Sequence, residues 1–327
     1  MRLLIKIGCF SQLLLACSVL ANSPLPAAQQ TFVDRMVSKH QFDAAQLTEL
    51  LQTTHKQQTI IDAIQRPWEA KPWYQYYPIF LTEKRRNDGV EFWLKHAEAL
   101  QKAEQQSGVP AEIIVAILGV ESNFGTHQGN HSVLDSLYTL GFHYPARAKF
   151  FTSELEQFLL LCREEKFDPR LIQGSYAGAM GWGQFIASSY RHYAVDFDQD
   201  SIRDLLNNPE DAIGSVANYF QKNGWKKGQP VAFKAKLTNS DVESLLSKNL
   251  KPEHQWQQVQ RRGISIDGSL DNHTPVKLLQ FDLSQGHEYW VGLNNFYTIT
   301  RYNHSPLYAM AVYQLSQQIK QQRQQQI

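Results

Sequence analysis

The hydrophobic pattern of the chain changes at Gly224, and this change constrains the fold more than any other feature. Before it, apolar residues recur at helical spacing at about residues 32–51, 89–106, 150–165 and 211–222. After it, short strand-like segments joined by turns lie at 231–237, 276–283 and 288–293. Ser305 and Pro306 then begin a closing helix, expected over 307–318. The pattern predicts a mainly α protein (α+β) with a small inserted β-rich domain.

The composition is that of an ordered globular protein. Of 327 residues, 43% are apolar and 12% aromatic, so the chain can bury a core large enough to offset its ordering entropy. Lys and Arg number 32 against 31 Asp and Glu, a net charge of +1, which provides no broad basic surface for phosphates. We expect no nucleic-acid partner, and we expect a monomer.

The first 21 residues have the pattern of an export signal. Arg2 and Lys6 precede an apolar stretch over residues 7–20, which Gln12 and other polar residues make too short for a permanent membrane span. Two cleavage sites compete. Residues 14–17 resemble a bacterial lipoprotein box with Cys17 as the lipid-bearing residue, and residues 19–21 suit an ordinary signal peptidase. We favour lipidation, which predicts a periplasmic protein of a Gram-negative bacterium, anchored to the outer membrane.

A carboxyl group lies near the end of the most apolar helical segment, residues 110–125. Glu121 follows Ile117 by four residues and Ile114 by seven, so a 3.6-residue period places it on the apolar stripe. Desolvation there would raise its pKa and produce a general acid that stays protonated near neutral pH. The alternative is a structural glutamate near a helix end, hydrogen-bonded by Ser122 or Asn123. The segment alone does not decide between them.

Two further clusters combine polar and aromatic residues. In residues 174–185, four glycines alternate with Tyr176, Trp182 and Phe185, a pattern that either lets the backbone approach a sugar ligand or forms a tight connection between packed helices. Residues 295–305 carry polar and aromatic side chains just before the closing helix. Taken alone, this third cluster is more typical of a strand end than of a site.

The spacing of acids in residues 196–207 is similar to that of an EF-hand loop. Asp196, Asp198, Asp200 and Asp204 occupy positions one, three, five and nine. Ser201 replaces the usual glycine, and Asn207 replaces the bidentate glutamate at position twelve. The loop is therefore an imperfect candidate for Ca²⁺, and the alternative is an acidic turn stabilised by its own backbone hydrogen bonds.

Together the three clusters around Glu121, the glycines and residues 295–305 resemble the lytic murein transglycosylases of the membrane-bound transglycosylase B family. The resemblance covers roughly residues 78–318 and includes the stretches 144–148, 193–197 and 212–220. It implies a lysozyme-like helical core, a helical N-terminal portion and a small β-domain. It also implies cleavage of peptidoglycan glycan strands between N-acetylmuramic acid (MurNAc) and N-acetylglucosamine (GlcNAc), with no cofactor required, and some members of the family bind a metal in the acidic loop.

The resemblance also assigns roles to residues of this chain. Glu121 would be the sole catalytic acid and base. The residues implied to contact the glycan are Ser175, Gln184, Tyr219, Tyr302, Asn303, Tyr308 and Arg147. The chain departs from the family at two places, since Ala146 stands where a first arginine is common and Phe150 where a tyrosine is frequent. Contacts to the peptide stem or lactyl group at those places are in doubt.

The implied reaction agrees with a single carboxylate, because substrate-assisted glycosidases let the sugar supply the nucleophile. The product would be a 1,6-anhydromuramyl end. A hydrolytic muramidase using the same Glu121 is the second hypothesis, and a noncatalytic peptidoglycan-binding protein is the third. The expected domains are a signal (1–21), a helical N-terminal portion (30–106), the catalytic core (107–228), a β-rich domain (229–300) and a return segment with the closing helix (301–327).

Overall fold

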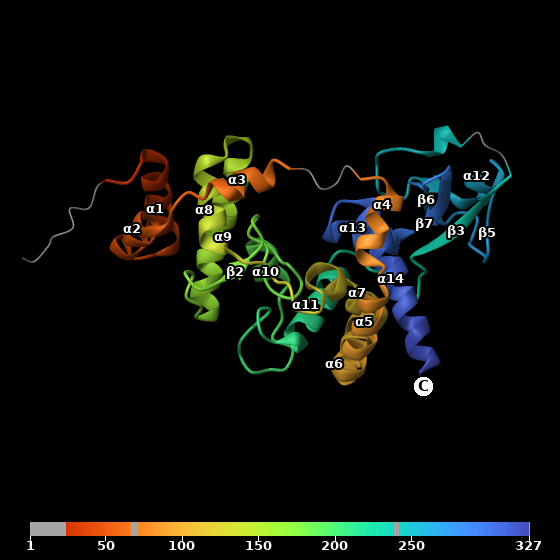
Figure 1. Cartoon of the computed structure of the whole chain (residues 1–327), viewed down its shortest axis with the longest axis horizontal. Coiled ribbons are helices and arrows are strands. Elements are labelled where there is room, and N and C mark those ends of the chain that lie inside the picture. The colour runs from red at the N-terminus through yellow and green to blue at the C-terminus, as the bar shows by residue number, and fades with distance from the viewer. Residues whose placement is uncertain (1–23, 67–70, 239–241, 327) are drawn as a thin grey trace, which may run out of the picture. The chain divides into compact units, whose positions relative to one another are not determined.

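The computed structural model describes residues 24–66, 71–238 and 242–326 (Figure 1). The predicted export signal, including Cys17, lies outside these residues. By its contacts the chain divides into two units, residues 1–53 and 54–327, and the finer division expected from the sequence stays a prediction. The first unit contains α1 (Ala27–His40) and α2 (Ala44–Thr53). The helical stretch expected over 32–51 is interrupted at Gln41, whose left-handed φ of 59° ends α1.

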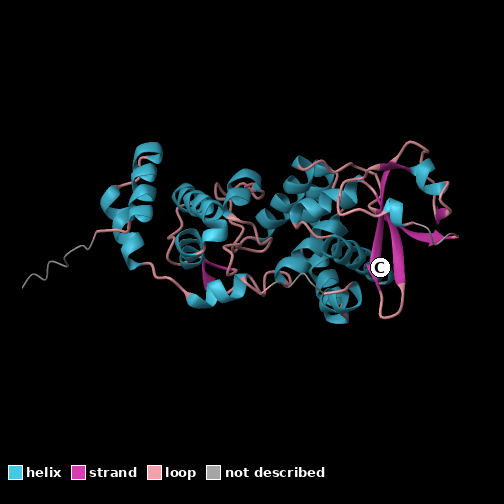
Figure 2. Ribbon diagram, turned by 90° about the horizontal axis from the view of Figure 1, so that it is seen from above, coloured by secondary structure: helices cyan, strands magenta, loops and turns pink. Residues whose placement is uncertain are grey.

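Twelve of the helices described lie in the second unit, and they make the chain mainly helical, as predicted (Figure 2). Before the sheet they are α3 (Gln58–Ile64), α4 (Trp73–Phe80), α5 (Glu83–Lys95), α6 (Ala97–Ser107), α7 (Ala111–Ser122), α8 (Val133–His143), α9 (Ala148–Glu165), α10 (Ala187–Tyr193) and α11 (Pro209–Lys222). Within and after the sheet they are α12 (Trp256–Gln260), α13 (Asn294–Tyr302) and α14 (Pro306–Gln325). Short 3-10 turns span Pro145–Arg147 (η1) and Glu243–Leu245 (η2).

Helix α7 forms the centre of the helical body. Apart from Glu112, its residues from Ala111 to Gly119 are apolar, and all of them are buried, as expected for a helix enclosed by others. The helices that pack against it are α5, α6, α11 and α14. Gly89 lets α5 approach α14, because a Cβ there would lie 2.5 Å from the Ile319 side chain. Gly119 on α7 makes room for the Phe124 ring, which a Cβ would meet at 2.7 Å, and so lets the turn after Glu121 fold back on the helix.

The β-rich region is a five-stranded antiparallel sheet in the order β4-β6-β7-β3-β5. Its strands are β3 (Ala232–Leu237), β4 (His254–Gln255), β5 (Ile264–Ile266), β6 (Pro275–Asp282) and β7 (His287–Gly292). One face covers a core that includes Trp256, Val259 and Val291. A separate pair, β1 (His131–Ser132) with β2 (Gln173–Gly174), lies in the helical body.

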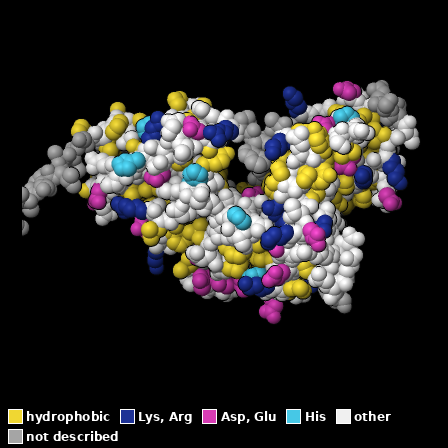
Figure 3. All heavy atoms as spheres, viewed as in Figure 1, with side chains coloured by type: hydrophobic (Ala, Val, Ile, Leu, Met, Phe, Trp, Pro, Cys, Tyr) yellow, Lys and Arg dark blue, Asp and Glu magenta, His cyan; other side chains and the backbone are white. Residues whose placement is uncertain are grey.

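Two local expectations were wrong. Residues 295–305 are not a strand end, because Asn294–Tyr302 form helix α13, whose buried side includes Phe296 and Ile299. The closing helix begins at Pro306 as expected but continues to Gln325, seven residues past the expected end at Gln318. Along the parts of the chain that the structure describes, no helix is long and apolar enough to span a membrane. On the face drawn in Figure 3, acidic and basic side chains are interspersed.

Candidate active site

Glu121 occupies the last turn of α7, where the chain leaves the helix through two left-handed residues. Asn123 has φ of 49° and Phe124 has φ of 57°, and the N–H groups of both bond to the Leu118 carbonyl. Gly125 completes the turn, since a Cβ there would lie 2.6 Å from the Trp182 ring. This turn fixes the direction of the Glu121 side chain, which stays partly exposed.

The Glu121 carboxyl lies against the first turn of α14. Tyr308, which is 3% exposed, donates its hydroxyl to Glu121 Oε1 at 2.5 Å. Burial raises the pKa of Glu121 to about 7, and the hydrogen bond from Tyr308 opposes this rise in part. A carboxyl with a pKa near 7 is able both to donate and to accept a proton at neutral pH. The general-acid hypothesis for Glu121 therefore gains support over the structural one.

A second tyrosine closes this side of the site. The Tyr302 hydroxyl donates to the Gly183 carbonyl at 2.6 Å, and a Cβ on Gly183 would lie 2.8 Å from that hydroxyl. Only glycine leaves room for this contact. Burial, with the neighbouring Glu121 charge, holds the pKa of both Tyr302 and Tyr308 well above 10, so both stay neutral. The two hydroxyls can donate hydrogen bonds but supply no charge.

Aromatic rings surround Tyr302. The Tyr219 ring meets it edge to face at 4.8 Å between centroids, and the Phe185 ring lies 5.6 Å away. The Tyr219 hydroxyl donates to the Arg301 carbonyl at 2.5 Å. Because Tyr219 is only 9% exposed, it acts in this structure mainly as a support for Tyr302.

The glycine-rich segment joins the site through Ser122. The Ser122 hydroxyl donates to the Trp182 carbonyl at 2.7 Å and accepts the N–H of Gly125 at 2.9 Å. Further along, Gln184 adopts a left-handed φ of 49° and its amide donates to the Gln128 carbonyl at 2.9 Å. Ser175 Oγ accepts the N–H groups of two following residues, at 3.0 and 3.2 Å. Both Ser175 and Gln184 remain partly exposed.

The glycines of this segment approach protein atoms closely. A Cβ on Gly174 would lie 2.3 Å from the Ala179 carbonyl oxygen, and one on Gly181 would lie 2.3 Å from that of Leu205. Each is therefore needed for a tight connection inside the protein. The sequence left open whether these glycines approach a sugar ligand or form a tight connection between packed helices. The tight connection accounts for both glycines without any ligand.

The structure gathers some of the predicted substrate-binding residues and leaves others apart. Tyr302 and Tyr308 meet at Glu121, with Tyr219 behind them. Asn303 is exposed at the end of α13, between the two tyrosines in sequence. Arg147 is exposed on η1, and its guanidinium lies 4.3 Å from the Phe150 ring, so its contacts are with that ring and not with the Glu121 cluster.

Sequence reasoning gave Ser122 only a structural role and missed Gln128. Gln128 donates to the Leu206 carbonyl at 3.0 Å, and Gln184 bonds its backbone in turn. Ser122 directly follows the candidate acid in sequence, and this position could have indicated that Ser122 helps to shape the site. Nothing in the local pattern around Gln128 marks it.

The acidic loop, residues 196–207, is followed by α11, whose first turn carries Asp211. Carboxylate oxygens of Asp196, Asp198 and Asp211 lie within 4.8 Å of one another. A calcium ion with ligands at 2.3–2.6 Å separates opposite oxygens by about this distance. Burial, with the charges of Asp196 and Asp198, raises the pKa of Asp211 to about 6. These three carboxylates fit a divalent cation, and Asp211 was not among the four predicted ligands.

The other two predicted ligands have different contacts. Asp200 accepts the N–H of Ile202 at 2.8 Å, and Asp204 accepts the N–H groups of Leu206 and Asn207 at 2.8 and 2.9 Å. Asp211 itself accepts the N–H groups of Phe197 and Asp204, at 2.6 and 2.7 Å. The loop thus also has the internal hydrogen bonds expected of a self-stabilised acidic turn.

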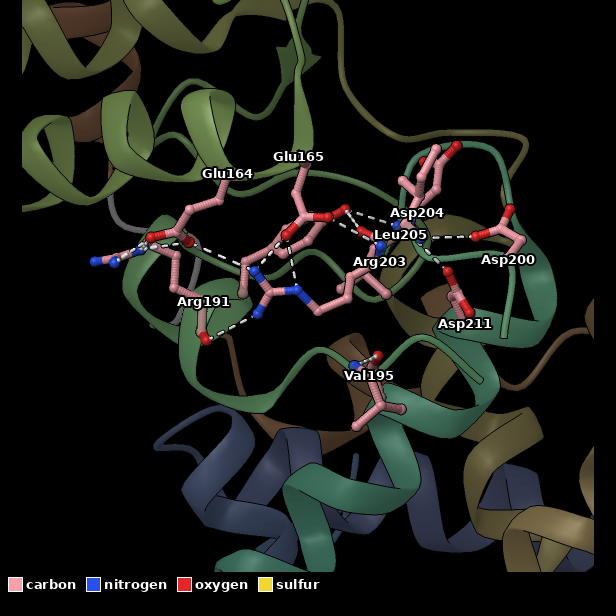
Figure 4. Close-up of polar contacts among 12 residues, drawn as sticks. Glu164, Glu165, Arg191, Val195, Asp200, Arg203, Asp204, Leu205 and Asp211 are labelled. Carbon is pink, nitrogen blue, oxygen red and sulfur yellow. Dashed lines mark hydrogen bonds and ion pairs between the residues drawn. The ribbon is translucent and has the colours of Figure 1, made fainter. Parts of the chain in front are cut away.

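An arginine anchors the loop to the helical body (Figure 4). Arg203 Nε donates to Glu165 Oε1 at 2.7 Å, and the backbone N–H of Arg203 donates to Glu165 Oε2 at 3.0 Å. Glu164 adds an ion pair with Arg191 and accepts a longer bond from Arg203 at 3.4 Å. Since Glu165 is buried, this pairing fixes the loop in one position.

Comparison with known proteins shows which family the chain is similar to. The sequence profile of the family described as "Transglycosylase SLT domain" matches residues 26–317. The chain is 46% identical over 304 residues to the membrane-bound lytic murein transglycosylase B of Escherichia coli (strain K12), covering 90% of this chain and 82% of that protein.

Solved structures show the same similarity. The structure of the Escherichia coli lytic transglycosylase Slt35 in complex with calcium is 44% identical, with a TM-score of 0.85, over 91% of this chain and 94% of that one. Pseudomonas aeruginosa SltB3, solved in complex with NAG-NAM-pentapeptide, is 30% identical, with a TM-score of 0.81, over 89% of this chain and 78% of that one. The likeness to Slt35 confirms the predicted lysozyme-like fold.

Proposed function

The chain belongs to the transglycosylase SLT domain family and is a lytic transglycosylase, and we propose that Glu121 cleaves the β-1,4 bond between MurNAc and GlcNAc as both acid and base. The observation that carries the proposal is the partly exposed carboxyl whose pKa burial raises to about 7. A similar protein, SltB3, was solved with NAG-NAM-pentapeptide, which contains both sugars. This supports peptidoglycan glycan strands as the substrate here.

The reaction needs one proton donated and one removed. Protonated Glu121 would give its proton to the leaving GlcNAc oxygen, while the 2-acetamido carbonyl of MurNAc attacks C1. The resulting Glu121 carboxylate would take the proton of the MurNAc C6 hydroxyl, whose oxygen then closes on C1 and releases the acetamido group. The product is a 1,6-anhydromuramyl end, and no water is consumed.

The hydrogen bond from Tyr308 supports this cycle in a specific way. It stabilises the Glu121 carboxylate that forms after the first proton transfer, while burial stabilises the protonated form needed before it. Among the described residues, no second carboxylate takes part in the hydrogen bonds around Glu121. The proposed cycle needs none, because the acetamido group of the substrate takes the place of the second carboxylate.

The product separates the proposal from the two alternatives. Digested sacculi analysed by mass spectrometry should contain anhydro ends, which are lighter than hydrolysed ends by one water. Glu121→Gln should bind glycan yet lose at least about 10²-fold in rate, the usual size of one general acid–base contribution. Products with reducing MurNAc alone would establish the hydrolase, and intact sacculi would leave a binding protein.

For the acidic loop we propose a calcium site formed by Asp196, Asp198 and Asp211. The close approach of their carboxylate oxygens supports it, as does calcium in the similar Slt35 structure. The ion would stabilise the loop and has no step in the reaction. We propose that the reaction itself needs no cofactor, because Glu121 and the substrate supply every group in the proposed steps.

For localisation we propose the periplasm, with the chain held at the outer membrane by lipid on Cys17. The sequence of residues 14–17 supports the lipid, and the name of the Escherichia coli relative includes "membrane-bound". We further propose that the chain acts as a monomer.

A further inference from the structure

A pocket of about 540 Å³ with aromatic walls lies between α4, α14 and the sheet. Four rings line it: Trp73 and Tyr77 of α4, Trp290 of β7 and Tyr313 of α14. The ring centroids of Trp73 and Tyr77 are 5.4 Å apart, and Trp290 meets Tyr313 edge to face at 6.2 Å. Trp73 is buried, whereas the other three residues keep exposed surface. The pocket therefore offers aromatic surface to a ligand from solution.

The charges in this pocket balance. Its lining contains one basic and one acidic side chain, Lys234 and Glu288, which form an ion pair at 3.2 Å. Glu288 also accepts the indole N–H of Trp73 at 3.1 Å. Besides the aromatic residues, the remaining polar side chains of the lining are the amides of Gln314, Gln317 and Gln318. Such a lining suits a neutral ligand that has both apolar and hydrogen-bonding surface.

A row of glutamines continues from this pocket along α14. A second pocket, of about 360 Å³, lies between α14 and α5 and shares Gln318 with the first. It too is lined by one acidic and one basic side chain, Glu83 and Arg86. The glutamines of α14 that line the two pockets, which together we call the glutamine groove, are Gln314, Gln317, Gln318, Gln321, Gln322 and Gln325. Within the described part of the chain, the side-chain amides of Gln314 and Gln321 have no hydrogen-bond partner, so they are available to a ligand.

The glutamine groove lies on the opposite side of α14 from the candidate acid. Tyr308 points from the first turn of α14 to Glu121. Gln317 is nine residues further along the helix, which is about two and a half turns and about 13.5 Å along the axis. Its side chain therefore leaves α14 on the side opposite Tyr308. A ligand in the glutamine groove would not occupy the position beside Glu121.

We propose that the glutamine groove binds a second stretch of peptidoglycan glycan, separate from the stretch at Glu121. This rests on the proposed function, because the substrate of that reaction is the same polymer. N-acetylated sugar rings have apolar C–H faces that suit Tyr77, Trp290 and Tyr313, and hydroxyl and amide groups that suit the glutamines. Neighbouring strands of a sacculus can fill both sites at once, so binding at one site raises the effective concentration at the other. The groove thus holds the enzyme on the sacculus, and the chemistry at Glu121 is unaffected.

Side-chain amide NMR of the Glu121→Gln protein tests the site directly, because this variant should bind glycan without cleaving it. The probe is tri-N-acetylchitotriose, a short neutral chain of β-1,4-linked GlcNAc. Its addition should shift the amide signals of Gln314 and Gln317 but not that of Gln324, which lies on α14 outside the groove. Gln184 reports on the catalytic site in the same spectrum. Shifts at Gln184 alone would overturn the proposal while upholding glycan binding at the catalytic site.

Binding to intact sacculi gives the second test, again in the Glu121→Gln protein. Tyr77→Ala should raise the dissociation constant by about three- to tenfold, because a ring contact and the linkage between the two sites are both lost. Tyr74→Ala is the matched control, since Tyr74 lies on the same helix and is 38% exposed against 37% for Tyr77, but lies outside the groove. Gln317→Ala should raise the dissociation constant by about threefold, and it tests the groove without altering the aromatic packing.

The outcomes separate the glutamine groove from the reaction. Unchanged affinity for sacculi in both Tyr77→Ala and Gln317→Ala would overturn the glycan site and leave the groove to a protein partner, while anhydro products from the wild type would still uphold the transglycosylase reaction. Equal losses in Tyr74→Ala and Tyr77→Ala would also overturn it, because the effect would not be specific to the groove. If Tyr77→Ala does not fold, Gln317→Ala and the amide shifts decide. Amide shifts in the groove, together with products that carry only reducing MurNAc, would instead reject the proposed function and keep the groove.

Discussion

Replacing Glu121 with glutamine should stabilise the protein, and by an amount that depends on pH. Burial raises the pKa of the carboxyl from 4.5 to about 7. Between these values the folded protein keeps a proton that the unfolded chain has released, so the free energy of unfolding falls as pH rises. At about 1.4 kcal/mol for each pH unit, the loss reaches about 3 kcal/mol above pH 7.

Glutamine removes this loss while keeping the shape of the side chain. Its amide oxygen still accepts the Tyr308 hydroxyl, which lies 2.5 Å from the carboxyl in the wild type. The difference in unfolding free energy between Glu121→Gln and wild type should therefore be small near pH 4 and grow to about 3 kcal/mol by pH 8. Urea unfolding of both proteins across this range measures the difference.

The other titratable groups contribute equally to the unfolding free energy of both proteins, so their contributions cancel in the difference. The pKa of Asp211 is also raised, to about 6, but it is present in both proteins. Glu91→Gln, on the exposed face of α5, is the matched control for adding an amide and should leave the wild-type curve unchanged. A constant difference between Glu121→Gln and wild type from pH 4 to 8 would refute a desolvated carboxyl at this position.

Four further outcomes are expected. Tyr308→Phe should lower kcat/KM by about tenfold or more, since hydrogen bonds to charged groups contribute about 1.5–3 kcal/mol. It should also move the basic limb of the pH profile to higher pH, because the hydrogen bond from Tyr308 lowers the pKa of Glu121. Gly183→Ala should lower the free energy of unfolding by about 1–3 kcal/mol by displacing Tyr302, as urea melts would register. Millimolar calcium should raise the melting temperature, and a chelator should reverse this rise. A melting curve that neither of them moves would contradict the calcium site. Cys17→Ser should move the protein from the membrane fraction to the soluble periplasm, and a wild-type mature terminus at Asn22 would contradict lipidation.

The sequence predicted the elements whose pattern is local. The apolar period of residues 110–125 located α7, and it placed Glu121 on the apolar stripe before any partner was known. The strands β3, β6 and β7 lie within one residue of the expected segments. In each case the residues that determine the element are neighbours in the chain, so a short stretch of sequence is enough to predict it.

Long-range packing explains the failures. Residues 296–300 are aromatic and β-branched, which favours a strand, yet α13 buries Phe296 and Ile299 at helical spacing against the rest of the fold. Asp211 escaped notice because it lies beyond the twelve-residue loop, and only folding brings it to Asp196 and Asp198.

The pKa of Glu121 likewise depends on segments that are distant in sequence. Tyr302 and Tyr308 come from the chain that returns after the sheet, more than 180 residues beyond Glu121 in sequence. Residues 232–292 lie between α11 and this returning segment, and α13 packs against both β7 and α14. Loss of the cover that the two tyrosines provide would let water reach the carboxyl and lower its pKa toward 4.5. At neutral pH Glu121 would then be ionised and unable to protonate the leaving oxygen, so the packing of α13 and α14 controls whether the acid is available at all.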